Sequence, residues 1–438
     1  MQSKVSMVVP CYNKVQMIGA MLESVIGQIW DNIELILVND GSTDGTRQII
    51  SQYEPKIRIR GYELIIVDQE NGGCCAAVYA GLIRVTGEYY CLVDCDDAID
   101  PEYVSRMAGW LDTHSDYEWA ACSYKECKDN QKTVSNTIIK NYPQDTSRLL
   151  EKWLFRVVIS TVWIYMARVS YIKKCGMTEN WCVENRKTYE PLVAIPLMAG
   201  KGKLKYFHED LYQYNIFASD LYKFYRYEDI TSFYNDFLYL YNWSIKRLTY
   251  QRTEKKRLLT LARLSYIQEL FLHCPNAPDG VKHLETLAVE TSQFLNTIFE
   301  PSPYIQPKTI LLDKGKYLFT AIMLSVLNIE FEEAPLGRVI GYGALGRMAK
   351  RLLPCLNATK WRPTELWDKA GEGTDILKPD FASLADKDTI LLFPIDRQIE
   401  EEIREELVGR NIRVFNLLEI THLISTLYYP QFKNARLK

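Results

Sequence analysis

The chain has 438 residues, with 52 Lys or Arg against 55 Asp or Glu, and its formal net charge is −3. This near balance excludes a general nucleic-acid binder, which would carry a strongly basic domain or face. Hydrophobic residues at 47% and charged residues at 24% exclude a mostly disordered chain. At roughly 150 residues per domain, the length predicts two or three domains.

The sequence gives no signal for a membrane span or for export. No segment approaches the ~20 uninterrupted apolar residues that cross a bilayer, and the apolar part of the N-terminus is too short for a signal peptide. The cysteines number 11, an odd count, and they do not show the paired spacing of a zinc site. We therefore expect a soluble, cytoplasmic protein whose reduced thiols pack as small apolar side chains.

Predicted strands and helices alternate over the first hundred residues. Strands are predicted at 4–10, 33–39, 62–68 and 88–93, and helices at 15–28, 44–53 and 74–86. Asp44 is the expected N-cap of the second helix. Strands that alternate with helices through short links predict an α/β fold with a parallel sheet covered on both faces.

Four polar segments fall at the carboxyl ends of these predicted strands. They are residues 10–13, 40–46, 71–73 and 94–97. In parallel sheets the ligand lies beyond the carboxyl ends of the strands. Because four independent placements agree, the sequence predicts a ligand site at this edge of the sheet.

The rest of the chain reads as two further regions. Residues 145–217 mix helical and strand-like pieces, 227–327 are mainly helical, and a proline-containing loop at 300–307 interrupts them. A new βαβ pattern then predicts strands at 338–341, 365–368, 389–393 and 412–415, with helices at 345–353 and 398–408. We therefore expect domains at 1–217, 218–334 and 335–438, the middle one a mainly helical connecting region.

Two acids follow the fourth predicted strand directly. Asp94 and Asp96 are separated by one residue, and residues i and i+2 at a strand end point the same way. Carboxylate oxygens with open coordination suit Mg²⁺ or Mn²⁺, which would bridge to the phosphates of a ligand. The alternative is a polar turn whose acids cap the helix that follows near Pro101.

Asp40 follows the second predicted strand and begins a glycine-rich turn. Its carboxylate can accept hydrogen bonds from a base or a ribose, and the turn glycines permit close approach of a ligand. The alternative is a strand-to-helix turn in which backbone amides satisfy Asp40. Asn71 and Gly73 likewise offer donors and bare backbone at a ligand rim.

Taken in order and spacing, these segments resemble the family 2 glycosyltransferases. The resemblance covers about residues 3–110, and more loosely it extends to about residue 217. It rests on Val-Val-Pro-Cys-Tyr-Asn at 8–13, Val-Asn-Asp-Gly-Ser-Thr-Asp-Gly at 38–45, Asn-Gly-Gly at 71–73 ahead of Ala80-Gly81, Gly-Glu-Tyr at 87–89 and Asp-Cys-Asp-Asp at 94–97.

The resemblance implies a GT-A fold, a nucleotide-diphosphate sugar donor and a divalent metal, Mg²⁺ or Mn²⁺. The reaction would be transfer to an acceptor hydroxyl with inversion at the anomeric carbon, with a UDP-sugar as the first candidate donor. By motif position, Pro10, Tyr12 and Asp40 would line the nucleoside pocket. Asp94 would lie near the ribose or sugar, or beside the metal, and Asp96 would ligate the metal.

One position departs from the family pattern. Many members carry Ala-Arg-Asn in the helix after Asn-x-Gly, where this chain has Ala77-Val78-Tyr79. Because of this departure, the resemblance leaves open which sugar donor is bound and which residues bind its diphosphate.

Inversion by direct displacement needs a general base that takes the proton of the acceptor hydroxyl. In the family this is an acid in the second half of the domain. Here Glu190, just before the apolar segment 192–199, is the candidate base, and Glu184 is the reserve. The alternative for either is an acid favoured at a helix N-terminus by the helix dipole.

A second nucleotide-like signature lies near the C-terminus. Gly341, Gly343 and Gly346 follow a predicted strand and open a helix, and Asp368 ends the next strand. This context suits a nucleotide-binding turn with an acid for the ribose, although glycine-rich turns also serve tight strand–helix packing. We expect a Rossmann-like accessory domain with a candidate nucleotide site.

The leading hypothesis is a cytoplasmic, inverting, metal-dependent glycosyltransferase. By analogy with the family its acceptor would be a glycan or a lipid-linked precursor of surface polysaccharide or glycolipid, reached by peripheral contact with the inner membrane face. The alternatives are a non-catalytic nucleotide-sugar-binding subunit and an NAD(P)-dependent oxidoreductase that works through the C-terminal domain.

Overall fold

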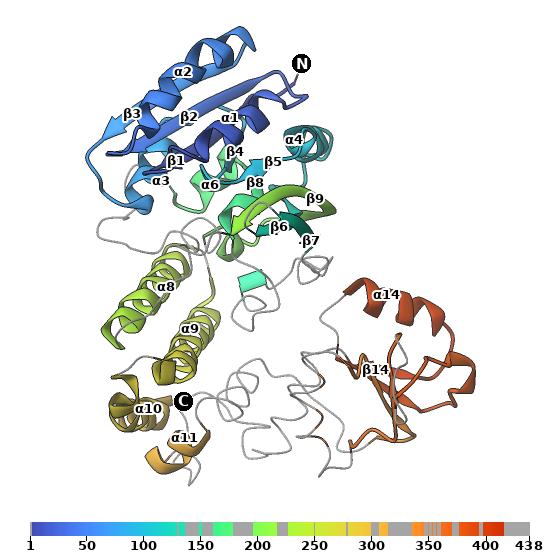
Figure 1. Ribbon diagram of the computed structural model, residues 1–438. Coiled ribbons are helices and arrows are strands. Elements are labelled where there is room, and N and C mark those ends of the chain that lie inside the picture. Colours follow the sequence, from blue (N-terminus) through green and yellow to red (C-terminus); the bar gives the residue numbers. More distant parts are fainter. Residues whose placement is uncertain are drawn as a thin grey trace. The chain divides into compact units, whose positions relative to one another are not determined.

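In a computed structural model the chain forms two compact units, residues 1–223 with 232–259 and residues 224–231 with 260–438. Each unit is described by itself (Figure 1). The three predicted domains stay a prediction. The structure describes residues 2–128, 131–135, 149–150, 161–177, 196–216, 227–248, 250–276, 279–298, 306–313, 335–345, 349, 353, 356, 361–369, 376–393 and 397–415.

A large mixed sheet forms the first unit. Its strand order is β3-β2-β1-β4-β8-β6-β9-β5, with β7 paired to β6. Strands β1 to β4 run parallel, and β8 is antiparallel to β4 and β6. The strands are β1 (Val5–Cys11), β2 (Ile33–Asp40), β3 (Glu63–Gln69), β4 (Tyr89–Leu92), β5 (Ala98–Ile99), β6 (Trp119–Lys128), β7 (Gln131–Ser135), β8 (Tyr165–Arg168) and β9 (Leu204–Ile216).

Helices connect and cover this sheet. In chain order they are α1 (Ile18–Ile26), α2 (Thr46–Ile59), α3 (Cys74–Leu82), α4 (Tyr103–Thr113), the 3-10 helix η1 (Val162–Ile164) and α6 (Val169–Lys174). Helices α8 (Tyr227–Arg247) and α9 (Arg252–His273) contribute residues to both units. The unit is thus a mixed α/β fold, as the GT-A expectation requires.

The parallel strands form the core of the first unit. Every residue of β1 and β2 is buried, so both faces of these strands are covered, as is typical of parallel sheets. Helix α3 packs against β1 and β2. Its Gly81 faces Val8 so closely that an added Cβ would lie 2.3 Å from Val8 Cγ1. The glycine therefore sets how closely α3 approaches the sheet.

The helix after β2 differs from the expectation at both ends. It continues to Ile59 although Pro55 lies inside it, and the fully buried Ile57 accounts for the extension. Its N-cap is Gly45 rather than Asp44. The Asp44 carboxylate nevertheless accepts the Thr46 N–H at 3.0 Å, so it satisfies one of the helix's first amides.

The second unit contains a parallel sheet of five strands in the order β12-β11-β10-β13-β14. The strands are β10 (Val339–Tyr342), β11 (Glu365–Trp367), β12 (Ile376–Leu377), β13 (Thr389–Leu392) and β14 (Arg413–Phe415). Helix α14 (Arg397–Glu406) joins β13 to β14, and the unit also holds α10 (Leu284–Ile298), α11 (Pro307–Asp313) and short 3-10 turns at Cys274–Asn276, Gly280–His283 and Phe381–Ser383.

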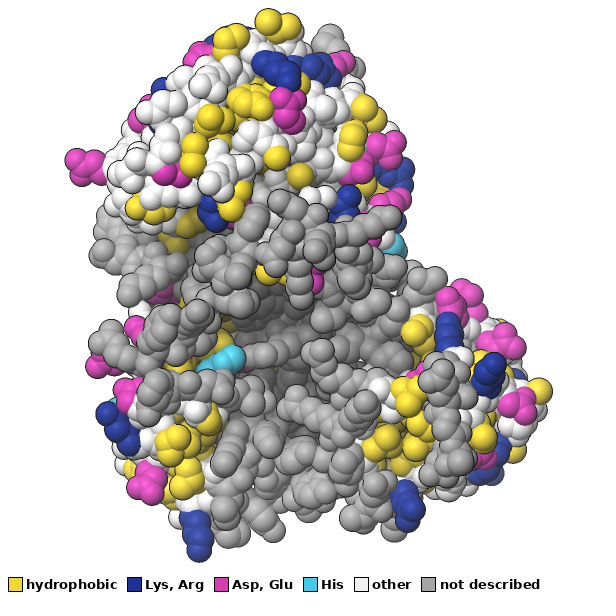
Figure 2. Space-filling view, in the orientation of Figure 1, with side chains coloured by type: hydrophobic (Ala, Val, Ile, Leu, Met, Phe, Trp, Pro, Cys, Tyr) yellow, Lys and Arg dark blue, Asp and Glu magenta, His cyan; other side chains and the backbone are white. Residues whose placement is uncertain are grey.

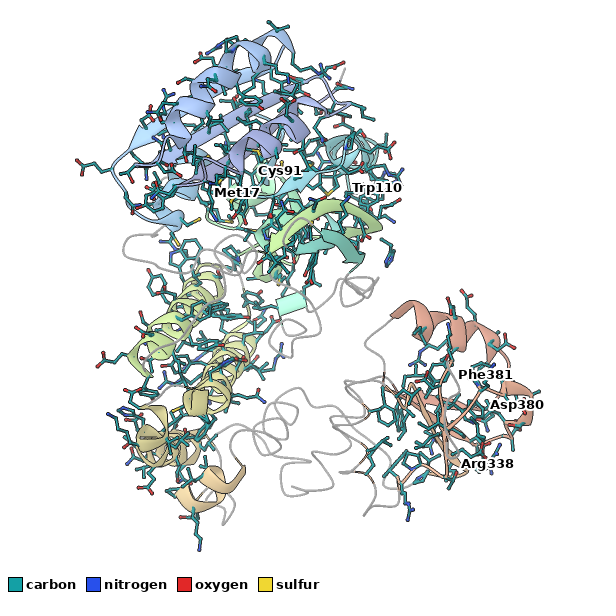
Figure 3. All side chains as sticks on the ribbon, in the orientation of Figure 1. Met17, Cys91, Trp110, Arg338, Asp380 and Phe381 are labelled. Atoms are coloured by element: carbon teal, nitrogen blue, oxygen red, sulfur yellow. The ribbon has the colours of Figure 1, made fainter. Side chains whose placement is uncertain are left out.

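An ion-pair cluster lies at the start of β10. The Arg338 guanidinium donates to Asp388 at 2.8 Å and to Glu365 at 2.6 Å, and Asp388 is 2% exposed. Figure 3 labels Arg338 with Phe381, whose ring packs against Tyr342. Burial alone would raise the pKa of Asp388, but hydrogen bonds from the Ala385 and Arg338 amides and the Arg338 guanidinium outweigh it and hold this pKa below its ordinary value.

On the face that Figure 2 shows, acidic and basic side chains of the first unit are interspersed rather than gathered by sign. Among the described helices, none has the length and apolar character needed to cross a membrane.

Candidate active site

A cavity of about 440 Å³ opens at the carboxyl ends of the parallel strands. Its size falls in the range of small-molecule sites. The seven residues predicted to form the donor and metal site all line it. The lining residues are Pro10, Cys11, Tyr12, Lys14, Asp40, Asn71, Gly73, Cys74, Ala77, Asp94, Cys95, Asp96, Trp163, Tyr214 and Asn215.

The loops after β1 and β2 are fixed to each other. The Asn13 N–H donates to Ser42 Oγ at 3.1 Å, and Asn13 Oδ1 accepts the Thr43 N–H at 2.8 Å. These bonds hold the segment in which Tyr12 lines the cavity with 46% of its surface exposed. An exposed ring beside a cavity can stack on a flat ligand.

Asp40 is 2% exposed and holds the loop that follows β3. Its Oδ1 accepts from Gln69 Nε2 at 2.7 Å and from the Gly72 N–H at 2.9 Å, and its Oδ2 accepts from the Gly73 N–H at 2.9 Å. The backbone amides thus satisfy Asp40, as the alternative interpretation expects, while the residue also lines the cavity. Asp40 therefore shapes the rim that Asn71 and Gly73 form.

Asp94 and Asp96 follow β4, whose Cys91 is labelled in Figure 3. Both acids line the cavity, and Lys14 Nζ lies 2.7 Å from Asp96 Oδ2. The described residues contain no group of three or more His, Cys, Asp or Glu side chains placed to hold a metal. Two carboxylates that face a cavity do suit Mg²⁺ or Mn²⁺, because such ions take further ligands from phosphate and water.

A third acid, Asp97, is buried behind the other two. Burial raises its pKa well above the ordinary value, and the neighbouring carboxylates of Asp94 and Asp96 raise it further. A raised pKa favours the neutral form of Asp97, so the negative charge that would attract a cation at this end of the sheet comes from Asp94 and Asp96.

Stacked aromatic rings form the wall of the cavity beside β9. Trp163 stacks on Tyr212 with ring centroids 4.4 Å apart and on Tyr214 with centroids 5.3 Å apart. Trp163 lies in the apolar stretch of residues 153–166. The sequence motifs do not place Tyr214, Asn215 or Lys14 at the site, and the sequence leaves residues 153–166 as an acceptor wall, a membrane-facing surface or ordinary core. Trp163, Tyr214 and Asn215 come from segments far along the chain from the strand-end motifs.

The candidate bases Glu184 and Glu190 lie outside the described residues, and so does Gly346. In the second unit, Gly341 lies in β10 and Gly343 follows it with φ +77. Asp368 Oδ2 accepts the Leu345 N–H of this turn at 3.1 Å. The structure therefore brings Asp368 to the glycine turn.

Residues 6–172 match the family model "Glycosyl transferase family 2". Glycosyltransferase GlyA of Streptococcus pneumoniae is 36% identical over 104 residues, which cover 24% of this chain and 14% of that protein. The putative glycosyltransferase EpsH of Bacillus subtilis is 34% identical over 152 residues, 34% of this chain and 42% of that protein. The chain thus matches less than half the length of these relatives.

Solved structures give weaker likenesses. S. aureus TarS 1–349 in complex with UDP-GlcNAc has a TM-score of 0.49 at 18% identity, over 76% of this chain and 94% of that one. The mannosyltransferase PcManGT of Pyrobaculum calidifontis, in complex with GDP-Man and Mn²⁺, has a TM-score of 0.42 at 14% identity, over 72% of this chain and 85% of that one. TM-scores this low do not establish a shared fold.

The family match falls on the segment that carries the strand-end motifs. The N-terminal part of the chain is therefore similar to glycosyltransferase domains, as the motifs predicted. The cavity lies in the same unit as this match.

Proposed function

We propose that the chain is an inverting, metal-dependent glycosyltransferase that moves a sugar from a nucleotide-diphosphate donor to an acceptor hydroxyl. The observation that carries the proposal is the convergence of seven motif residues on one cavity. They are Pro10, Tyr12, Asp40, Asn71, Gly73, Asp94 and Asp96.

In this proposal the two ends of the cavity have different tasks. Tyr12 and the loop held by Asp40 bind the nucleoside, and Asp94 and Asp96 face the sugar and the diphosphate. A divalent cation held by Asp96, with Asp94 beside it, would neutralise the negative charge of the leaving diphosphate. Lys14, already paired with Asp96, adds positive charge to the same region.

The acceptor hydroxyl attacks the anomeric carbon as the bond to the diphosphate oxygen breaks, which inverts that centre. A carboxylate must take the hydroxyl proton, and we assign this task to Glu190, with Glu184 in reserve. Glu190→Gln should lose turnover while donor binding is kept. Unchanged turnover would remove Glu190 from the mechanism.

A panel of nucleotide-sugars, beginning with UDP-sugars, tests the proposal. Nucleoside diphosphate release is measured with Mn²⁺ and with EDTA, in wild type and in Asp96→Ala. Asp68→Ala is the control, because Asp68 lies near the end of β3 with a half-exposed side chain and does not line the cavity. We expect release from at least one donor, abolished by EDTA and by Asp96→Ala but retained in the control.

Other outcomes favour the alternatives. Donor binding without release would indicate a non-catalytic nucleotide-sugar-binding subunit. Hydride transfer with NAD(P) and no sugar chemistry would indicate an oxidoreductase that uses the C-terminal unit.

The acceptor and its location follow from family analogy rather than from residues. We propose a glycan or lipid-linked acceptor of surface polysaccharide or glycolipid synthesis, used in the cytoplasm at the inner membrane face. Sedimentation with vesicles of anionic lipid tests the membrane contact, and protein that stays in the supernatant at low salt would count against it.

For the C-terminal unit we propose a Rossmann-like domain that binds a nucleotide. The strand order places β10 next to β13, where the order reverses, and such switch points hold ligands in doubly wound sheets. The contact of Asp368 with the glycine turn puts a carboxylate beside that point. The test is the thermal shift of the full chain with NAD(P) and with UDP-sugars, read against Asp368→Ala; no shift with any of these ligands would assign the glycine turn to packing.

A further inference from the structure

Asp97 differs from the two acids that precede it in the turn after β4. Asp94 and Asp96 line the cavity, but Asp97 does not, and its side chain is only 2% exposed. Its side chain hydrogen-bonds to β9. A buried carboxylate is costly unless donors satisfy it, so the partners of Asp97 indicate what it does.

Both oxygens of Asp97 bind residues of β9. The Tyr212 hydroxyl donates to Oδ2 at 2.7 Å, and the Asn215 N–H donates to Oδ1 at 2.8 Å. The same two residues also bind the turn. The Tyr212 hydroxyl accepts the Asp94 N–H at 3.1 Å, and Asn215 Nδ2 donates to the Asp96 carbonyl oxygen at 2.7 Å. One network therefore fixes the backbone at Asp94 and at Asp96.

Regular strand pairing stops before this turn. Strand β4 ends at Leu92, the Val93 N–H still donates to the Val8 carbonyl at 3.0 Å, and pairing resumes in β5, where Ala98 is opposite Gln213 of β9. The Asp97 N–H closes the turn on the Asp94 carbonyl at 3.1 Å, and the bonds to β9 join the turn to the neighbouring strand. Tyr212 is a rigid partner, because its ring is fully buried and stacks on Trp163.

We propose that Asp97 is a positioning residue. Through Tyr212 and Asn215 it fixes the turn that presents Asp94 and Asp96 to the cavity, and it thereby sets the affinity of that site for a divalent cation with a nucleoside diphosphate. The inference rests on the proposed function. Groups that orient the residues of a metal site typically change metal affinity 10–100-fold when they are mutated.

The test compares Asp97→Asn with Glu34→Gln. Glu34 is a fully buried carboxylate of the same sheet that accepts the Thr86 N–H at 3.0 Å and the Ser6 hydroxyl, and it does not line the cavity. Both variants lose a buried carboxylate, so both lose stability. Isothermal titration then measures the binding of UDP with Mn²⁺ below the unfolding temperature of each protein.

We expect about a tenfold or greater loss of Mn²⁺-dependent UDP affinity in Asp97→Asn, and less than about a twofold change in Glu34→Gln. An Asp97→Asn affinity within about twofold of wild type would overturn the inference, as would an equal loss in both variants. Wild type that binds no UDP with Mn²⁺ would instead refute the proposed function, and the inference with it.

Tyr212→Phe keeps the test decisive if Asp97→Asn does not fold. It removes one hydroxyl and leaves the stacked ring in place. Because that hydroxyl joins Asp97 to the Asp94 N–H, we expect the Mn²⁺-dependent affinity to fall in the same direction. Unchanged affinity in Tyr212→Phe would contradict the network.

Discussion

Replacing Asp40 by Asn tests how the rim of the cavity is held. The change keeps the shape of the side chain and removes one acceptor oxygen. If the Asn oxygen takes the place of Oδ1, it keeps the bonds to Gln69 and to the Gly72 N–H. The Asn NH₂ group then faces the Gly73 N–H, which loses its acceptor.

The expected loss in the free energy of unfolding follows from these two donors, the amide NH₂ group of the variant and the Gly73 N–H, which face each other without an acceptor. A buried donor without a partner costs about 1–3 kcal/mol, and the two bonds that remain lose their charge assistance. We therefore expect Asp40→Asn to lower the free energy of unfolding by about 2 kcal/mol. The loss should fall on the loop of residues 71–73, whose amides the carboxylate holds.

Urea unfolding of the first unit, followed by tryptophan fluorescence, measures this loss against Asp68→Asn. Asp68 lies at the end of β3 with its side chain 50% exposed and pairs with Arg47 at 2.8 Å. A pair of this exposure contributes about 0–1 kcal/mol. Equal losses in the two variants would refute the argument that the part-buried bonds of Asp40 are stronger than an exposed ion pair.

Gly81→Ala should destabilise the chain by about 1–2 kcal/mol, because the clash with Val8 exceeds the gain in helix propensity; thermal unfolding measures it, and Val8→Ala in the same chain should relieve it. Tyr12→Ala should leave stability within about 0.5 kcal/mol and weaken UDP binding about tenfold or more by loss of stacking, which titration calorimetry checks; unchanged affinity would remove Tyr12 from the nucleoside site. Because the pKa of Asp388 is lowered, its stabilising contribution is present above the unfolded pKa of about 3.9 and is lost as pH falls through the folded pKa. The stability gap between wild type and Arg338→Met should therefore be wide at neutral pH and close in acid; a gap that does not depend on pH would exclude this linkage.

The parallel half of the sheet was predictable because its signals are local. Strands such as β2 are continuous apolar runs bounded by turn residues, and their predicted ends lie within one or two residues of the observed ones. Strand β12 has only two residues and gave no pattern. Strand β6 was not predicted, because it depends on pairing with β8 and β9, distant in sequence.

The candidate site likewise has a part that the sequence predicted and a part that it did not. Its strand-end motifs could be placed from sequence, because parallel strands bring their carboxyl ends to one edge. Tyr214 and Asn215 could not be placed, because nothing local indicates that the end of β9 reaches that edge. The role proposed for Asp97 could not be predicted either, because the sequence of a polar turn does not show whether its acid faces solvent or binds a tyrosine.

The bonds between the acid turn and β9 join residues 115 to 119 positions apart, whereas Asp40 meets its partners 29 to 33 positions away. Contacts of large sequence separation must overcome a larger loop-closure entropy and form more slowly. During synthesis the nucleoside side of the cavity can therefore form while the acids are still unanchored. Competence to bind a nucleoside diphosphate should appear only when β9 has joined the sheet, so the site forms late in the folding of its unit.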